Sequence, residues 1–436
     1  MITRDLESIE KARAKMKSVK YIRNRLMSVA IITIFMIAVF PLESFAAGRD
    51  EAAAIPNRVY LLSNVASENT VMVFDRATDG ALTLLQQAST GGFGSGAGQI
   101  APPFPPFPGP VPLESQDALI KSGDGRFLIA VNAGSNNVSV LKIVQDGLTL
   151  VDRVPSLGFF PVSVAEHKGL VYVANAGQTP DERPGAVPSI IGFRLASNGK
   201  LKLIHGSIRR VGSANAAAAD LVFGPDGKSL VMTELNGNMV DLFRIGEDGR
   251  VMEEIRTPAN SRTPLGAQFS SGNILAIAES NDSGRRQAVA AGASVSSYRL
   301  AGDGSLVPVS KAVASGEAAG GWIRFTPDGR FAFAINNGSG SISAYSVSSD
   351  GQLTLVNAKA ANIGGPLSSP ADAVITGDGK FLYVIVALDG INGRPQFPLP
   401  ASVAAVYAYQ IASDGSLSLI GKTSGLPYTV QGIAAE

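Results

Sequence analysis

GGWIRFTPDGRFAFAINNGSGSISAYSVSSDGQLTLVNAKA, the stretch from Gly320 to Ala360, contains four short apolar segments in a row. Asp328-Gly329 separates the first segment from the second, and Asp350-Gly351 separates the third from the fourth. An Asp-Gly pair between two apolar runs is typical of the tight turn in a β-hairpin. The stretch therefore predicts four consecutive antiparallel strands.

The same unit recurs along the chain. The turn between third and fourth strands has seven copies, at Asp79-Gly80, Asp146-Gly147, Asn198-Gly199, Asp248-Gly249, Asp303-Gly304, Asp350-Gly351 and Asp414-Gly415. The turn between first and second strands has six, at Asp124-Gly125, Lys168-Gly169, Asp226-Gly227, Ser271-Gly272, Asp328-Gly329 and Asp378-Gly379. Repeated four-stranded units are typical of a β-propeller. We predict an all-β, seven-bladed propeller of four-stranded antiparallel blades over residues 58–436.

The missing first strand belongs to the N-terminal unit, which begins with its second strand, RVYLLSN, at Arg58. The last residues of the chain, YTVQGIAAE, have the pattern of an innermost strand. Pairing Tyr428–Ala434 beside Arg58–Asn64 would leave no open sheet edge between the first and last blades. We therefore expect the N- and C-terminal strands to close the ring.

Composition excludes several classes of function. The 37 Lys and Arg residues nearly balance the 36 Asp and Glu residues, so we expect no nucleic-acid partner. The absence of cysteine excludes disulfides and thiolate chemistry. With only two histidines, the chain lacks the ligand clusters of an electron-transfer propeller, and we expect no cofactor and no metal. His205 and Trp322 are interpreted as packing residues, and His167 as a surface turn residue.

The first residues indicate export. Lys20, Arg23 and Arg25 precede an apolar run of 17 residues from Leu26 to Leu42, and small residues at Ser44 and Ala46 suit a cleavage site. We predict a signal peptide over residues 1–46, a linker over 47–57 and a periplasmic or secreted protein. An uncleaved membrane anchor is the alternative.

The tight turns should all lie at one end of the ring, because successive strands are antiparallel. Four long segments should gather at the opposite end: Gly91–Glu114, Gln178–Pro188, Asn281–Gly292 and Asp389–Pro400. We assign this loop-bearing face as the functional face. Candidate ligand-binding cations on these segments are Arg183, Arg285, Arg286 and Arg394. A solvated rim without a ligand is the alternative.

The Gly/Pro-rich loop over residues 91–114 is not a phosphate-binding loop, because no Gly-Lys-Ser/Thr follows its glycines. We interpret it as a flap that ends in a polyproline stretch and either covers the channel mouth or presents Phe104 and Phe107 to a partner.

The blade motifs resemble the lactonase family of seven-bladed propellers, which includes cycloisomerase-type 6-phosphogluconolactonases and carboxymuconate cyclases. The resemblance covers residues 58–436 and rests on ADLVFGPDGKSLVMTELNGNMVDLFRI, WIRFTPDGRFAFAINNGSGSISAYSVSSDGQLTL and ADAVITGDGKFLYVIV. It implies a His pair ahead of the blade that begins ADLVFGPDG, a Pro-Arg step ahead of the next blade, and a Glu at the end of that blade's second strand.

This chain matches those positions only in part. The His positions fall at Ala217 and Ala219, and the Arg position falls near Leu265, after Pro264. The acid is present as Glu279, and Glu234 holds the equivalent place one blade earlier. The candidate catalytic residues are therefore Glu279, Glu234 and Asp220. To work at neutral pH, the Glu would need a pKa raised by burial or by a like-charged neighbour, and Asp220 and Glu279 would form such a pair if both face the channel.

These observations predict an exported, monomeric, lactonase-like propeller that binds a small molecule or an envelope protein at its loop-bearing face. A membrane partner is expected only if the N-terminal segment stays uncleaved. The alternative is a working enzyme, a carboxylic ester hydrolase acting on a sugar-acid lactone like 6-phosphogluconolactonase, or a muconate cycloisomerase-like enzyme acting on a muconolactone.

Overall fold

The computed structural model describes residues 57–96, 113, 115–177, 187–213, 216–281, 291–366, 368–390 and 402–436. These residues belong to one compact unit, residues 54–436, which is distinct from residues 1–53. The predicted signal peptide and nearly all of the predicted linker lie outside the described residues. Within the described part of the chain, no helix has both the length and the apolar character needed to cross a membrane.

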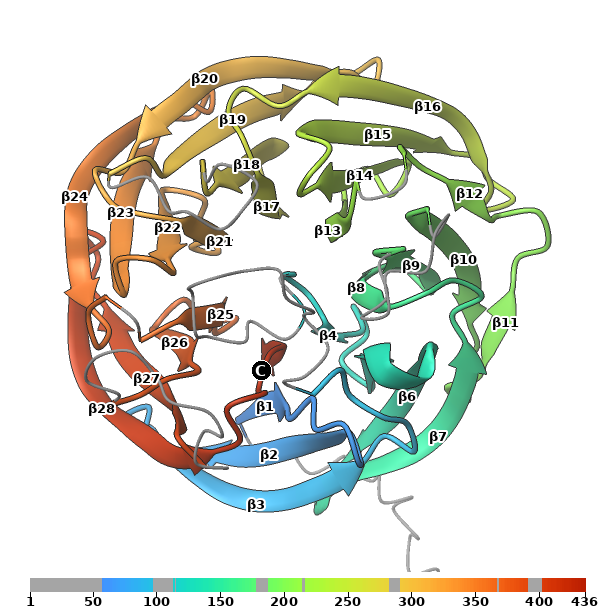
Figure 1. The fold of residues 1–436 in the computed structure, drawn as a ribbon, viewed down its shortest axis with the longest axis horizontal. Helices are drawn as coiled ribbons and strands as arrows, with labels where there is room; N and C mark the ends of the chain where they lie inside the picture. Colours follow the sequence, from blue (N-terminus) through green and yellow to red (C-terminus); the bar gives the residue numbers. More distant parts are fainter. Residues whose placement is uncertain are drawn as a thin grey trace, which may run out of the picture. The chain divides into compact units, whose positions relative to one another are not determined.

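The described residues form seven antiparallel sheets arranged around one axis (Figure 1). The innermost strand of each sheet lies beside the axis, and these strands are β29 (Ile433–Ala435), β4 (Leu119–Lys121), β8 (Pro161–His167), β13 (Ala218–Phe223), β17 (Pro264–Phe269), β21 (Gly320–Phe325) and β25 (Pro370–Ile375). The second strands are β1 (Arg58–Leu62), β5 (Phe127–Asn132), β9 (Leu170–Asn175), β14 (Ser229–Glu234), β18 (Ile274–Glu279), β22 (Phe331–Asn336) and β26 (Phe381–Val386).

The third and fourth strands lie progressively farther from the axis (Figure 1). The third strands are β2 (Thr70–Arg76), β6 (Asn137–Val144), β10 (Ser189–Leu195), β15 (Met239–Ile245), β19 (Ser294–Leu300), β23 (Ser341–Val347) and β27 (Ala404–Ile411). The outer strands are β3 (Leu82–Ser89), β7 (Gly147–Pro155), β11 (Leu201–Leu203), β12 (Arg209–Arg210), β16 (Val251–Pro258), β20 (Leu306–Ala314), β24 (Leu353–Asn362) and β28 (Leu417–Leu426). A short 3₁₀ helix, η2 (Ala133–Ser135), connects β5 and β6. The predicted seven-bladed propeller of four-stranded blades is confirmed.

The ends of the chain share one blade. β29 pairs with β1, with Val59 opposite Ala435 and Leu61 opposite Ile433. Backbone hydrogen bonds continue this pairing, since Leu62 N donates to Gly432 O at 2.9 Å. The predicted ring closure is confirmed, although the regular strand is shorter than the nine-residue segment YTVQGIAAE.

One blade departs from the regular pattern at its outer edge. Its outer strand is broken into β11 and β12, which both pair with β10. His205 lies in the break, is exposed, and accepts a hydrogen bond at its carbonyl from Arg250 Nε at 2.8 Å. The interpretation of His205 as a packing residue is therefore wrong, because the strand that would bury it ends at Leu203.

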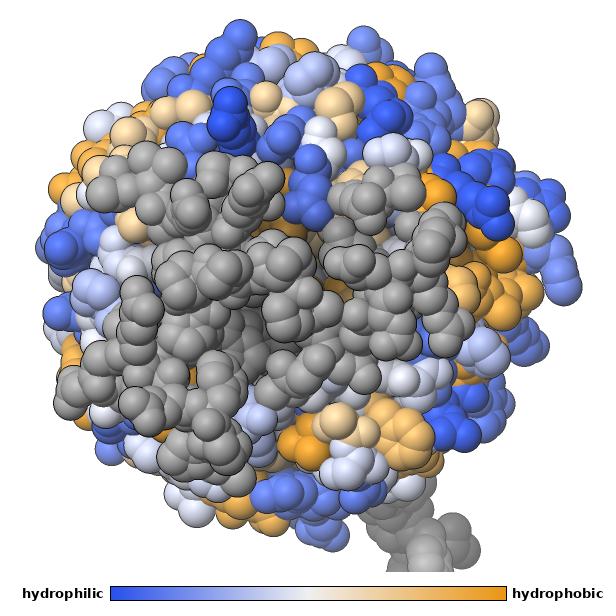
Figure 2. Space-filling view, viewed as in Figure 1, coloured by the Kyte–Doolittle hydropathy of each residue, from blue (hydrophilic) through white to orange (hydrophobic). Residues whose placement is uncertain are grey.

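The hydrophobic core lies between neighbouring blades. Every residue of the second strands β5 and β26 is buried, whereas exposed and partly buried residues dominate the outer strand β16. Trp322 is 1% exposed, which confirms its packing role. Each fully buried Val, Leu, Ile or Phe side chain of the second strands stabilises the fold by about 1.5–3 kcal/mol. In Figure 2, hydrophilic side chains surround the rim and hydrophobic ones form separate patches, as expected of outer strands with one solvated face.

The Asp-Gly turns connect strands within a blade and also pack against the neighbouring blade. Gly80 has a φ of +89°, which favours glycine, and Asp79 accepts a hydrogen bond from Ala81 N at 3.0 Å. A Cβ at Gly80 would also lie 2.7 Å from the ring of Phe381 in the neighbouring blade. These turns form one end of the ring, called here the tight-turn face.

Candidate functional site

Asp220, the candidate acid on an innermost strand, lies fully buried within β13. It accepts hydrogen bonds from Ser163 Oγ at 3.0 Å, Ala267 N at 2.7 Å and Gln116 Nε2 at 3.2 Å. Burial raises the pKa of Asp220 well above its ordinary value, and the charge of Asp117 raises it further, while the hydrogen bonds from Ala267 and Ser163 and the charge of Arg324 oppose the shift. The side chain therefore joins three blades to a segment near the axis.

That segment, Ser115–Asp117, precedes β4 and bridges several innermost strands. The buried Gln116 donates to Ala267 O at 2.6 Å and accepts from Ile323 N at 3.0 Å. Ser115 O accepts from Trp322 Nε1 and from Gln431 Nε2, both at 2.8 Å. We call Ser115–Asp117 the axial segment. Sequence reasoning missed it, because it has no periodic pattern and its partners lie far away in the chain.

Close packing at the axial segment explains one glycine. A Cβ on Gly266 would lie 2.6 Å from Gln116 Oε1 and 2.9 Å from Gly321 O. Gly266 therefore leaves the space in which the Gln116 amide reaches β17 and β21.

Arg324, on β21, is the buried cation near the axis. Its Nε donates to Ala373 O at 2.6 Å, and its Nη2 lies 2.8 Å from Asp117 Oδ1 and 3.3 Å from Asp372 Oδ1. Burial raises the pKa of Asp372 to about 7, although the neighbouring Arg324 opposes this. Arg324 was not among the predicted site residues. The sequence signal that could have found it is a charged residue within the otherwise apolar WIRF segment.

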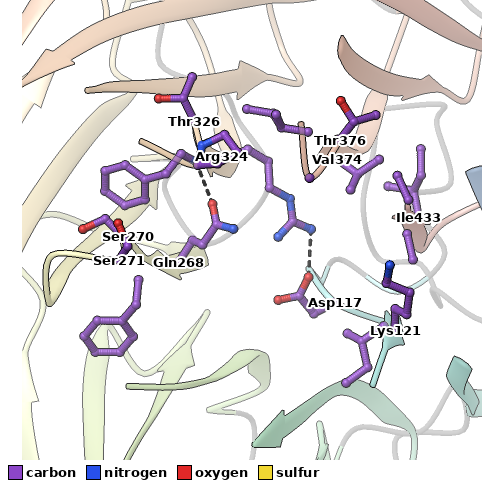
Figure 3. A pocket seen from close by; sticks show the side chains of 18 of the residues that line it. Asp117, Lys121, Gln268, Ser270, Ser271, Arg324, Thr326, Val374, Thr376 and Ile433 are labelled. Carbon is purple, nitrogen blue, oxygen red and sulfur yellow. Dashed lines mark hydrogen bonds and ion pairs between the residues drawn. The ribbon is translucent and has the colours of Figure 1, made fainter. Parts of the chain in front are cut away.

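Arg324 and Asp117 line a cavity of about 320 Å³ (Figure 3). The cavity also contains Gln268 and is bordered by the turns at Ser270-Ser271, Thr326-Pro327 and Thr376-Gly377. These turns connect first and second strands, so this axial cavity lies toward the tight-turn face, opposite the predicted functional face.

Glu279 is fully buried at the end of β18, away from this cavity. Ser296 Oγ and Ser261 N donate to its Oε1 at 2.8 and 3.0 Å, and Ser294 Oγ donates to its Oε2 at 2.7 Å. Burial raises its pKa, while these three donors oppose the shift. The carboxylate thus connects strands of its own blade.

Glu234 belongs to a different cluster, within its own blade. Its Oε1 lies 2.7 Å from Arg256 Nη2, and Arg256 Nε lies 3.0 Å from Asp241 Oδ1. Burial and the adjacent Glu234 raise the pKa of Asp241 to about 8. Glu234 Oε2 and Asp241 Oδ2 are both buried without a hydrogen-bond partner in the described structure.

The two glutamates occupy one repeated position of the fold. The last residue of the second strand is Glu234 in β14 and Glu279 in β18, and it is Asn132, Asn175 and Asn336 in β5, β9 and β22. Asn336 Nδ2 donates to Ser341 Oγ and Ser343 Oγ at 3.1 and 2.8 Å, and these serines lie on the third strand, as Ser294 and Ser296 do. Glu279 therefore replaces an amide that joins second and third strands, whereas Glu234, at the same position, pairs with Arg256 on the outer strand β16.

The structure does not bring the predicted catalytic residues together. Asp220, Glu234 and Glu279 have three separate sets of partners, with no hydrogen bond or ion pair between them among the described residues. The four candidate ligand-binding residues, Arg183, Arg285, Arg286 and Arg394, lie outside the described residues, as do Phe104 and Phe107.

The positions at which the resemblance implies histidine and arginine are apolar and buried. Ala217 is 4% exposed, Ala219 is fully buried, and Leu265 is 6% exposed. The described residues also contain no group of three or more His, Cys, Asp or Glu side chains arranged to hold a metal ion.

Comparison with known proteins finds one family model that matches part of the chain. Residues 293–391 match the family model described as "Lactonase, 7-bladed beta-propeller". No curated protein sequence matches the chain.

Among solved structures, a proposed 6-phosphogluconolactonase from Bacteroides fragilis is similar over 88% of this chain and 99% of its own, with a TM-score of 0.60 and 18% identity. The periplasmic gluconolactonase of Pseudomonas aeruginosa is similar over 87% and 98%, with a TM-score of 0.63 and 16% identity. At these identities the likeness shows the fold. Residues 293–391 thus match the lactonase family model, and the fold that the chain shares with these structures is a seven-bladed β-propeller.

Proposed function

We propose that this chain is an exported binding propeller, which holds a small molecule or an envelope protein at its loop-bearing face and does not open lactone rings. The observation that carries the proposal is the position shared by Glu234 and Glu279 with three asparagines. At this position the asparagines and Glu279 bind serines of the third strand, and Glu234 pairs with Arg256 of its own blade, so each side chain has a structural partner.

The missing proton carrier supports the same proposal. Opening a lactone ring needs a group that transfers a proton and a positive group that stabilises the oxyanion. The places where the family resemblance implies His and Arg hold Ala217, Ala219 and Leu265, which cannot do either. Glu279 is held by two serine hydroxyls and a backbone amide, and none of these contacts supplies a cation.

The loop-bearing face is proposed as the binding face because four long segments are inserted there by sequence, including those that carry the four candidate arginines. Loops on a rigid scaffold are where binding groups concentrate. Export is proposed from the charged and apolar pattern of residues 1–46.

The test is hydrolysis of sugar-acid lactones and muconolactones by the purified protein, by Glu279→Gln and by the exposed control Glu247→Gln. We expect none of the three proteins to hydrolyse the lactones faster than buffer alone, because within the described residues no side chain at the family's catalytic positions is placed to transfer the proton. Turnover above buffer that is lost in Glu279→Gln and kept in Glu247→Gln, with both variants folded by circular dichroism, would establish the lactonase alternative and overturn the proposal.

A further inference from the structure

The axial cavity holds three polar side chains that point toward its interior from separate parts of the chain (Figure 3). They are Asp117 ahead of β4, Gln268 on β17 and Arg324 on β21. Its volume of about 320 Å³ is at the lower end of the range for ligand pockets, about 300–1,000 Å³. A site of this size suits a small molecule.

Each of the three side chains has hydrogen-bonding capacity that its protein contacts leave unused. Gln268 accepts from Phe325 N at 2.6 Å through its Oε1, and its Nε2 has no partner among the described residues. Arg324 uses Nε and Nη2, so Nη1 remains available in the described structure. Asp117 accepts from Arg324 through Oδ1, which leaves Oδ2 as an acceptor.

The positions of these groups are fixed by the fold. The Arg324 side chain is 6% exposed and is held by Ala373 O and two carboxylates. Asp117 has a φ of +59°, and its carbonyl accepts from Val164 N at 3.0 Å, so its backbone is held against β8. A preorganised set of donors and acceptors loses little entropy when a ligand binds.

The charges of the cavity are already paired. Arg324 contacts both Asp117 and Asp372, and Lys121, at the edge of the cavity, lies 2.5 Å from Glu436 Oε2. An anion would therefore meet no unpaired cation and would face the Asp117 carboxylate. A hydroxyl group both donates and accepts, so neighbouring hydroxyls can satisfy Asp117 Oδ2 together with the donors of Arg324 and Gln268.

We propose that the axial cavity is a binding site for a small neutral polyhydroxylated molecule, with Asp117 as hydrogen-bond acceptor and with Gln268 and Arg324 as donors. This site lies at the opposite end of the channel from the loop-bearing face. It is separate from the proposed binding function there and does not depend on it.

The test compares sorbitol with gluconate, its anionic counterpart, which has a carboxylate at one end and the same hydroxyl-bearing carbon chain elsewhere. Binding to the full chain is followed by ligand-detected NMR and by titration calorimetry. We expect millimolar binding of sorbitol and weaker binding of gluconate.

Two variants tie the binding to the cavity. Gln268→Glu keeps the acceptor for Phe325 N and removes the free donor, and Val374→Trp fills the cavity while leaving its polar side chains unsubstituted. Each should weaken sorbitol binding by about tenfold or more, the effect of losing one good hydrogen bond. The exposed controls Gln352→Glu and Val356→Trp should bind like the unchanged protein.

Two results would overturn the proposal. Gluconate binding more tightly than sorbitol would show an anion site. Sorbitol binding that is absent, or unchanged in folded Gln268→Glu and Val374→Trp, would show that the cavity holds solvent only. Neither result bears on lactone turnover, so the proposed function would stand or fall separately.

Discussion

A single side chain in this propeller takes its role from the blade position that it occupies. Glu279 lies where other blades have Asn132, Asn175 or Asn336, and its oxygens accept from hydroxyls on the neighbouring strand as part of the same arrangement. Sequence comparison with the family marks Glu279 as a surviving catalytic acid. Comparison of the same position in different blades of this chain marks Glu279 as a residue that joins two strands, and its contacts support this second interpretation.

Asp241 gives a prediction at the same scale. Its pKa is about 8 in the folded protein and about 4 in an unfolded chain, so between these values the folded state binds the proton more tightly. The stability of the fold should therefore decrease as pH rises from about 4 to about 8. The contribution of Asp241 to that stability is fully present below the pKa of the unfolded chain. Asp241→Asn, which carries no charge at any pH, should remove this part of the decrease.

Urea denaturation at about pH 5 and at about pH 8 measures this effect as the change in the free energy of unfolding. The control is Glu254→Gln, because Glu254 lies 3.9 Å from the same Arg256 and is partly exposed. The raised pKa values of Asp372, Asp220 and Glu279 contribute in the same direction in every variant. The effect of Asp241 is therefore the difference, between variant and unchanged protein, in how far the free energy of unfolding falls from about pH 5 to about pH 8. An equal decrease in Asp241→Asn and in the unchanged protein would contradict the account.

At the scale of elements, the axial segment Ser115–Asp117 connects several innermost strands. Without it, each of these strands contacts mainly its own blade and the strands of neighbouring blades. Gln116→Ala would leave Ile323 N and Ala267 O without their partners and remove a donor from Asp220. A buried polar group that loses its partner costs about 1–3 kcal/mol, so we expect a loss of stability of at least that size. Exposed Gln352→Ala should change stability by less than about 0.5 kcal/mol.

Chemical denaturation of the two variants provides the measurement. Because the axial segment reaches several blades, the unfolding transition of Gln116→Ala should move as a whole to lower denaturant. A midpoint equal to that of Gln352→Ala would show that the axial segment does not support the ring.

The elements also show what sequence reasoning can and cannot reach. The Asp-Gly turns and the apolar second strands follow from local chemistry, and they predict the blades, their number and the closing strand. The break at His205 and the contacts of Gln116 depend on groups more than a hundred residues away, or on a strand that ends early, and no local pattern carries that information. Sequence reasoning missed Arg324 for the same reason, because its carboxylate partners Asp117 and Asp372 lie outside its own blade.

The candidate site was predicted less well than the fold. Sequence reasoning placed Asp220 on an innermost strand, and the structure finds it there, with structural partners on three sides. The family resemblance implies only Glu279, and sequence reasoning added Glu234 as its equivalent one blade earlier and Asp220 as a like-charged partner. In the structure each of the three lies in its own hydrogen-bond cluster. Four of the seven proposed residues lie outside the described part of the chain and remain predictions.

At the scale of the whole molecule, everything depends on the ring being closed by its two ends. β29 lines the axial cavity through Ile433, Ala434 and Ala435, and it also pairs with β1. Each blade buries its faces only against its neighbours, so an open ring would expose the blades at the gap and distort the cavity.

The chain contains no cysteine, which allows a direct test of this closure. Val59 and Ala435 are opposite each other in the antiparallel pair. Facing residues in such a pair have Cα atoms about 4.5–5.5 Å apart, which is within the range of a disulfide. In the double variant Val59→Cys, Ala435→Cys, mild oxidation should form one intramolecular disulfide, visible as a mobility shift without reductant, and should raise the melting temperature. The pair Val59→Cys, Ser416→Cys should form none. Two free thiols in a folded Val59→Cys, Ala435→Cys protein would contradict ring closure and, with it, the placement of the axial cavity and of both faces.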